Sequence, residues 1–300
     1  MKKIAIVHKG KAYIPEARVY QDLLSQYGFQ VAYCRTNEEL AAENYDVEWH
    51  IMGADLPSFS KKDRFVIHEY LSLSVPPMAR LKNQMKKLLN RRPNLRIFNG
   101  AAIQSELDFQ DEVRHIIRNP GLSKDFFVDG QSEKAHDFVY LGAMDRRRNI
   151  PVFFDWVCRQ LPGSSILAIG TPPPVADLSK RYPNIHFVGQ VSHNEIPALL
   201  RTAECGLNLM PDLYPYHLQP SYKLIEYCAA GLKVITTDYL WANQFEEQHQ
   251  ARFFKLNRRF DNLHLEALSR FPFVTPDVSQ LTWEHSFRQS GLLDLLLSIH

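Results

Sequence analysis

The sequence lacks the features of several large classes of protein. With 35 Lys+Arg against 33 Asp+Glu residues, the formal charge is +2, which gives no reason to expect a nucleic-acid partner. The apolar run at residues 4–7 is too short for a signal peptide or a membrane span, and no transmembrane segment is predicted elsewhere. Four cysteines lie far apart, without Cys-x-x-Cys spacing: Cys34, Cys158, Cys205 and Cys228. We therefore expect reduced core cysteines in a cytosolic protein.

Common catalytic motifs are also missing. There is no Asp-x-Asp, so nothing in the sequence demands a divalent metal, and no histidine or cysteine cluster suggests zinc. The absence of Gly-x-Gly-x-x-Gly argues against a dinucleotide oxidoreductase, and the absence of Gly-x-Ser-x-Gly argues against a hydrolase of the nucleophile-elbow type. We expect neither a cofactor nor a metal ion.

Acidic residues are absent from one long stretch, residues 70–105, which contains seven Lys and Arg residues. Within it, residues 78–92 have helical spacing, with methionines and leucines on one side and cations flanking them. Such a basic amphipathic helix is typical of proteins that lie on anionic membranes. A solvated helix whose apolar stripe packs on its own sheet is the alternative. Both interpretations stay open here.

The length of 300 residues suits two α/β domains. Short buried strands alternate with helices, which predicts two Rossmann-like, doubly wound parallel sheets with ligands at the carboxyl ends of the strands. The polar run at 128–136 is the expected hinge. We place an N-terminal domain at residues 1–134, a second domain at 135–283 and a last helix at 284–300, with a cleft between the two domains.

The most informative stretch is residues 218–238. Ser221 and Gly231 are start and stop signals for a short helix, and residues 233–236 form the strand that follows. The positive N-terminus of such a helix suits a phosphate. Lys223 and Glu226 share one face, offering a cation to the phosphate and a carboxylate to ribose hydroxyls. An ordinary surface ion pair is the alternative.

This stretch resembles the donor-binding signature of GT-B-fold glycosyltransferases, which reads roughly P-x-x-K-L-x-E-Y-x-A-x-G-x-x-V-I. The matching residues are Pro220, Lys223, Leu224, Glu226, Tyr227, Ala229, Gly231, Val234 and Ile235. The resemblance is specific over residues 138–283 and only architectural over the first 130. It implies that the nucleotide sugar binds the second domain and the acceptor the first, and that the last helix crosses back to the first domain.

The resemblance extends to further donor-binding positions. Arg148, six residues after Gly142, stands where relatives often carry a pyrophosphate-binding lysine, although Ala143 replaces the usual arginine after the glycine. The complete expected donor site is Gly142, Arg146, Arg148, Gly170, Thr171, Gln190, Val191, Tyr216, Ser221, Tyr222, Lys223 and Glu226. An arginine run is otherwise most often a solvated turn, and the tyrosines of the 211–219 loop could simply pack there.

Catalysis with inversion would need a base from the first domain. Glu69 is the first candidate and Glu16 the second, and His68 lies beside Glu69 at the end of the predicted strand 64–68. His68 has a structural alternative, since histidines are usually satisfied, half-buried residues. Retaining relatives often carry a second glutamate where this chain has Leu218, so the anomeric outcome stays open.

The sequence thus predicts a metal-independent glycosyltransferase that moves a sugar from a nucleotide-sugar donor to a carbohydrate or glycolipid acceptor. By analogy, its setting would be bacterial surface polysaccharide or lipopolysaccharide synthesis, in the cytoplasm or at the inner face of the cytoplasmic membrane. Two alternatives remain. One is a GT-B-fold nucleotide-sugar epimerase, and the other is a non-catalytic protein that binds nucleotide sugars or glycans.

Overall fold

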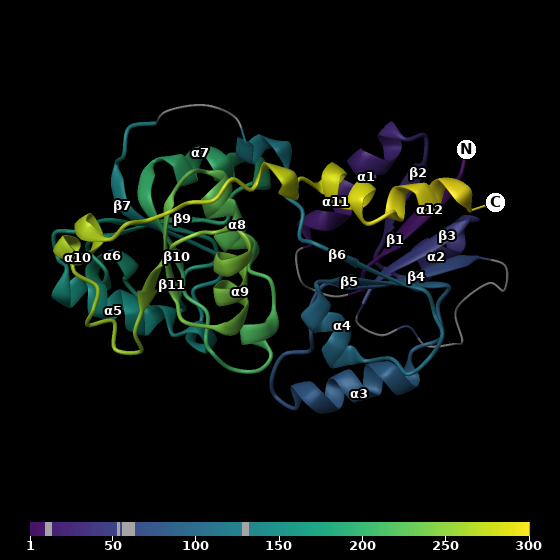
Figure 1. Ribbon diagram of the computed structural model, residues 1–300, viewed down its shortest axis with the longest axis horizontal. Coiled ribbons are helices and arrows are strands. Elements are labelled where there is room, and N and C mark those ends of the chain that lie inside the picture. Colours follow the sequence, from purple (N-terminus) through teal and green to yellow (C-terminus); the bar gives the residue numbers. More distant parts are fainter. Residues whose placement is uncertain (10–13, 53–54, 56–63, 128–131, 300) are drawn as a thin grey trace. The chain divides into compact units, whose positions relative to one another are not determined.

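The computed structural model describes residues 1–9, 14–52, 55, 64–127 and 132–299 (Figure 1). The chain forms two compact units, the first from Met1–Ser123 with Leu281–His300 and the second from Lys124–Gln280. The second unit therefore begins about ten residues earlier than the boundary predicted from the sequence, and part of the expected hinge, residues 128–131, lies outside the described residues. No described helix combines the length and the apolar character needed to cross a bilayer.

The first unit is built on a six-stranded parallel sheet in the order β2-β1-β3-β4-β5-β6. Its strands are β1 (Lys3–Val7), β2 (Gln30–Cys34), β3 (Val47–Ile51), β4 (Phe65–Tyr70), β5 (Leu95–Asn99) and β6 (His115–Arg118). Its helices are α1 (Pro15–Gln26), α2 (Asn37–Ala42), α3 (Ala79–Leu89), α4 (Ala101–Leu107), α11 (Trp283–Gln289) and α12 (Leu292–Ser298). Helices α1, α11 and α12 cover one face of this sheet, and α3 and α4 lie on the other (Figure 1).

The C-terminal segment differs from the single helix expected at 284–300. It forms two helices, α11 and α12, because Gly291 adopts a left-handed φ of 69° between them. Phe287 and Trp283 of α11 pack edge-on against Tyr20 of α1, with ring centroids 5.1 and 5.4 Å away. This aromatic contact joins the end of the chain to the first unit.

The second unit is built on another six-stranded parallel sheet, in the order β12-β11-β10-β7-β8-β9. Its strands are β7 (His136–Leu141), β8 (Ile166–Ile169), β9 (Ile185–Gly189), β10 (Ala203–Asn208), β11 (Lys233–Thr237) and β12 (Phe254–Leu256). Its α-helices are α5 (Ile150–Gln160), α6 (Leu178–Arg181), α7 (Ile196–Arg201), α8 (Tyr222–Ala229), α9 (Leu240–Gln248) and α10 (Leu265–Arg270), and short 3-10 turns include η2 (Lys124–Phe127), η3 (Arg146–Arg148), η4 (His193–Glu195) and η5 (Tyr216–Leu218).

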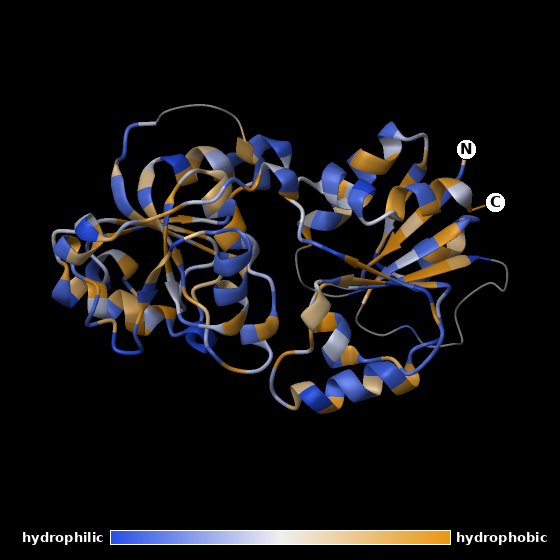
Figure 2. Ribbon diagram, viewed as in Figure 1, coloured by the Kyte–Doolittle hydropathy of each residue, from blue (hydrophilic) through white to orange (hydrophobic). Residues whose placement is uncertain are grey.

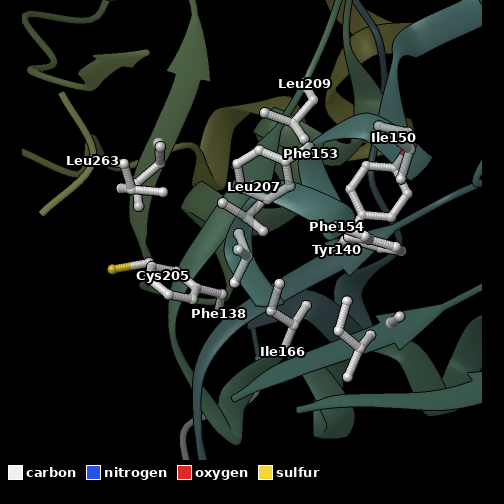
Figure 3. Close-up of a cluster of buried hydrophobic side chains, with 14 of the residues drawn as sticks. Phe138, Tyr140, Ile150, Phe153, Phe154, Ile166, Cys205, Leu207, Leu209 and Leu263 are labelled. Carbon is white, nitrogen blue, oxygen red and sulfur yellow. The ribbon is translucent and has the colours of Figure 1, made fainter. Parts of the chain in front are cut away.

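Helices α5 and α8 lie on opposite faces of this second sheet. Phe153 and Phe154 of α5 join strand residues such as Phe138 and Leu207 in one buried cluster (Figure 3), and each such side chain stabilises the fold by about 1.5–3 kcal/mol. On the other face, Gly206 of β10 lets α8 approach closely, since a Cβ there would lie 2.3 Å from the Tyr227 ring. The result is a rigid support for α8.

Candidate functional site

Helix α8 has the bounds that the sequence predicts, from Tyr222 to Ala229, with β11 following at Lys233–Thr237. Ser221 occupies the N-cap position, but its hydroxyl does not cap the helix. Instead Ser221 Oγ donates a hydrogen bond to Asn208 Oδ1 at 2.8 Å. The capping role expected of Ser221 is therefore wrong, and its side chain serves to fix the start of α8 to the end of β10.

Asn208 is the centre of a buried network that the sequence did not reveal. Its Nδ2 atom donates to Thr236 Oγ1 at 2.9 Å and to Tyr239 OH at 3.0 Å, while its Oδ1 atom accepts from Ser221. A second hydrogen bond between α8 and the sheet involves Tyr227, whose hydroxyl accepts a hydrogen bond from Leu141 N at 2.9 Å. Buried polar groups that are fully paired rigidify a site, so the first turn of α8 is held at the carboxyl ends of β10 and β11, and its second turn at the end of β7.

Lys223 lies in this first turn. Its Nζ atom is buried, has no hydrogen-bond partner among the described residues and lies 4.6 Å from the centroid of the Tyr140 ring. Burial and, second, the positive charge of Arg148 lower the pKa of Lys223 well below its ordinary value, and Asp145 and Glu226 oppose this effect. A buried ammonium without an acceptor is costly. A bound anion would supply the missing acceptor.

The arginine run after Gly142 forms the short turn η3, in which Asp145 Oδ1 accepts from Arg148 N at 3.2 Å. Arg146 is exposed, whereas Arg148 is half-buried and its Nε atom lacks a hydrogen-bond partner among the described residues. Burial raises the pKa of Tyr140 to about 12, and the neighbouring Arg148 opposes this rise. Arg148 and Lys223 therefore both lie beside Tyr140, and the two cations form one positive locus.

Glu226, one turn further along α8, is 6% exposed. Its Oε1 atom lies 3.4 Å from His193 Nε2 of η4, and its other oxygen has no partner among the residues that the structure describes. No ion pair joins Glu226 to Lys223 among those residues, so the surface ion pair considered for these two side chains is wrong. The second oxygen is available to accept hydrogen bonds from a ligand.

His193 is the contact that sequence reasoning missed. A signal was present, because residues 192–195 form a capping box directly after the strand that ends at Gly189. The sequence could therefore have placed His193 near the carboxyl edge of the sheet. Its pairing with Glu226, 33 residues away, could not be predicted from local pattern.

The glycines at the ends of β7 and β8 lie against each other. Gly142 and Gly170 both have φ of 125°, and Gly142 N donates to Ile169 O at 2.9 Å. A Cβ on Gly170 would lie 2.3 Å from Gly142 O, so only glycine fits there. The two loops consequently present bare backbone at the same edge as Arg148, an arrangement that allows close approach of a ligand.

The neighbouring loop residues continue this edge. Gln190 Nε2 donates to Thr171 Oγ1 at 2.8 Å, and Gly170 N donates to Gly189 O at 2.7 Å. Thr171 and Gln190 are exposed and Val191 is half-buried. The structure thus brings together Gly170, Thr171 and Gln190, three of the expected donor-site residues that follow β8 and β9.

Two tyrosines complete the expected set in the second unit. Tyr216 is half-buried in η5, and Tyr222 is half-buried at the start of α8. In the same loop, the Tyr214 and His217 rings meet edge-on at 6.3 Å. Contact of Tyr216 with a donor sugar stays a prediction.

The first-unit candidates occupy different surroundings from those expected. Strand β4 runs to Tyr70, so His68 and Glu69 lie within it and point to opposite faces, and the predicted strand end at 68 is wrong. Glu69 is fully buried, forms an ion pair with Arg118 and accepts hydrogen bonds from Tyr20 OH and Trp49 Nε1, both at 2.8 Å. These contacts argue for a structural role, and its role as a base stays a prediction.

His68 belongs to a buried polar cluster on the other face of β4. Its Nε2 atom lies 2.9 Å from Asp55 Oδ2, and burial lowers the pKa of His68 to about 4. Glu48 lies in the same cluster. Burial would raise its pKa, but hydrogen bonds with His50, Arg91 and Arg64 outweigh burial and lower it to about 2.

Glu16, the second candidate base, lies in the first turn of α1 and is buried. Asp, Glu, His and Cys side chains do not gather in groups of three or more that could hold a metal ion among the described residues.

No protein-family model matches the chain, and no curated protein matches its sequence. Solved structures do match over nearly its whole length. A sucrose-phosphate synthase from Thermosynechococcus elongatus is 14% identical, with a TM-score of 0.72 and 99% of both chains covered. Anabaena HepE, in complex with UDP and glucose, is 12% identical, with a TM-score of 0.60, 99% of this chain and 90% of HepE covered.

A proposed UDP-N-acetylglucosamine 2-epimerase from Listeria monocytogenes is 11% identical, with a TM-score of 0.62, and covers 100% of this chain and 97% of its own. At such identities the similarity concerns the fold. The chain has the GT-B fold, with two Rossmann-like units that each contain a six-stranded parallel sheet, as the sequence predicted.

Proposed function

We propose that this GT-B-fold protein is a glycosyltransferase that transfers a sugar from a nucleotide-sugar donor to a carbohydrate or glycolipid acceptor. The observation that carries the proposal is the buried Lys223 ammonium, without a hydrogen-bond partner among the described residues, beside Arg148 at the start of α8. Two adjacent cations at a helix N-terminus suit a diphosphate. The signature around Pro220 supports the same conclusion.

The roles of the other side chains follow from their positions. Glu226, with one carboxylate oxygen already near His193, would accept the ribose hydroxyls through its second oxygen. The bare backbone at Gly142 and Gly170 would admit the diphosphate, and Thr171, Gln190 and Val191 would lie along the nucleoside. Arg146, Tyr216, Ser221 and Tyr222 complete the proposed donor site.

The proposed reaction needs no divalent ion. As the glycosidic bond to the donor breaks, negative charge develops on the diphosphate, and Arg148, Lys223 and the N-terminus of α8 would stabilise it. The first unit would bind the acceptor, with Glu69, Glu16 or His68 as the candidate base if the reaction inverts the anomeric configuration.

The test is a thermal-shift screen with UDP-, GDP-, ADP-, dTDP- and CMP-linked sugars. HepE binds UDP, so we expect a UDP-sugar to give the largest shift. Glu226→Ala should abolish that shift and change the melting temperature of the ligand-free protein by only a few degrees, because its carboxylate makes a single long contact. Glu246→Ala, which removes a partly buried carboxylate from α9, is the matched control and should keep the shift.

A second function has a specific observation in its favour, the similarity to the proposed epimerase from Listeria. An epimerase would alter the sugar of the donor without an acceptor, whereas a transferase would need one. Analysis of the donor after incubation alone, by chromatography of the released sugar, separates the two. Binding of a donor that stays unchanged with every acceptor would indicate a non-catalytic binding protein.

A further inference from the structure

Helix α3 turns its apolar side toward solvent. The exposed apolar side chains of α3 and of its N-cap residue Met78, with their exposed fractions, are Met78 65%, Leu81 53%, Met85 48%, Leu88 81% and Leu89 50%. Ala79 and Asn83, one turn apart on the opposite side, are the buried residues of the helix. The packing of this stripe on its own sheet, one of the two interpretations of the sequence, is therefore wrong. Figure 2 shows hydrophobic and hydrophilic residues alternating along α3.

The helix is anchored through its other side. Asn83 Oδ1 accepts from Ser74 N at 2.9 Å, and Lys82 Nζ donates to Val75 O at 3.2 Å. These polar contacts and the small Ala79 hold α3 to the first unit without using its large apolar residues. The apolar residues of the stripe therefore keep about half or more of their surface exposed to solvent.

The charge around the stripe has one sign. Residues 70–105 contain seven cations and no carboxylate. Arg91 and Arg96 are neutralised by ion pairs with Glu48, Asp55 and Asp111. Among the residues that the structure describes, Lys82, Lys87 and Arg92 have no ion pair, and Arg80 adds a further positive charge on α3.

We propose that α3 is an interfacial helix that inserts its leucines and methionines into an anionic phospholipid surface. The charge favours this occupant. A second copy of the chain would place like charges opposite each other, whereas anionic headgroups would pair with Lys82, Lys87 and Arg92 while the stripe enters the acyl boundary. The class of acceptor follows if the proposed function holds. Because the unit that would bind the acceptor carries α3, the acceptor is lipid-linked.

Co-sedimentation with vesicles tests the surface. The full-length protein should bind vesicles that contain phosphatidylglycerol, bind pure phosphatidylcholine vesicles at least about tenfold more weakly, and lose affinity as salt screens the charges. No binding to the anionic vesicles, or equal binding to both kinds, would overturn the proposal. A dimer in size-exclusion chromatography would also overturn it if the α3 variants described next are monomeric.

Matched variants locate the contact. Leu81→Gln/Leu88→Gln replaces two exposed leucines by a good helix former and should weaken vesicle binding at least about tenfold. Leu265→Gln on α10 is the control, since Leu265 is 53% exposed, the same fraction as Leu81. Lys82→Gln/Lys87→Gln should lower both the affinity and its salt dependence, and Lys180→Gln on α6 should change neither. Unchanged binding by the α3 variants would contradict the proposal.

The two proposals fail in different ways. If the protein shows a thermal shift with a donor but does not bind vesicles, the membrane inference fails and the donor site stands. If it binds vesicles through α3 but no nucleotide sugar, the proposed function fails. If both proposals hold, Leu81→Gln/Leu88→Gln should lose sugar transfer to a lipid-linked acceptor in anionic vesicles and keep the thermal shift with the donor. Equal transfer by this variant and by the unchanged protein would refute the lipid-linked acceptor.

Discussion

Replacing Lys223 by methionine should change stability little and weaken ligand binding strongly. Methionine keeps most of the length and apolar volume of the side chain but removes the buried ammonium. That ammonium has no hydrogen-bond partner among the described residues and lies near the charge of Arg148. Replacing buried charges by apolar groups is often neutral or stabilising by about 1–4 kcal/mol.

This gain in stability is reduced because Lys223→Met also removes one favourable contact. Lys223 Nζ lies 4.6 Å from the Tyr140 ring centroid, and a desolvated cation–π contact contributes about 2 kcal/mol. We therefore expect Lys223→Met to change the unfolding free energy by about −2 to +2 kcal/mol. The melting temperature should then change, in either direction, by roughly 2–4 °C for each kcal/mol.

Donor affinity, in contrast, should fall clearly. A hydrogen bond to a charged group contributes about 1.5–3 kcal/mol, so the dissociation constant of the best nucleotide diphosphate should increase roughly 10- to 150-fold. Calorimetric titration and thermal denaturation of the same two proteins give both quantities. A variant that loses several kcal/mol of stability and binds the ligand as before would refute the assignment of Lys223 to a ligand.

The same residue predicts a proton linkage. Folding lowers the pKa of Lys223. At pH values between this lowered pKa and the ordinary lysine pKa near 10.4, the unfolded chain therefore binds more protons than the folded chain. The unfolding free energy of the ligand-free protein consequently rises with pH in this range. A bound diphosphate would raise the pKa again. Binding should therefore take up protons above the folded pKa, measurable as a buffer-dependent binding enthalpy that Lys223→Met abolishes.

Two further substitutions test the packing. Gly170→Ala should destabilise the fold by about 2–4 kcal/mol in chemical denaturation, since its Cβ would lie 2.3 Å from backbone at a φ of 125°. Gly163→Ala, with open space around it, should be nearly neutral, and equal effects would contradict the argument. Glu69→Gln should cost about 3–5 kcal/mol, because it leaves Arg118 buried without its carboxylate. A variant with full stability and no activity would instead establish Glu69 as catalytic.

The sequence predicted α8 and β11 closely because each end carried a local signal. Ser221 and Gly231 delimit the helix, and the β-branched residues at 234–237 favour a strand. Local signals also explain the failures. The apolar spacing of residues 174–181 predicts a helix, but α6 covers only Leu178–Arg181. Asp177, a residue type that tolerates the left-handed conformation, has a φ of 52° directly before Leu178, so the helix begins only there.

Buried charged residues show where sequence reasoning reaches its limit. Glu69 and Lys223 are both polar residues in apolar surroundings, and their patterns alone suggested catalysis for one and binding for the other. In the structure Glu69 has a cation and two further donors, and Arg118 comes from a strand 49 residues away. Lys223 Nζ has no acceptor among the described residues. A buried charge is costly unless it is paired. A charged side chain that the fold itself pairs therefore needs no ligand. A buried charged side chain that the fold leaves unpaired favours binding of a ligand that carries the opposite charge. This distinction rests on partners that are distant in sequence, and for that reason only the folded chain separates the two residues.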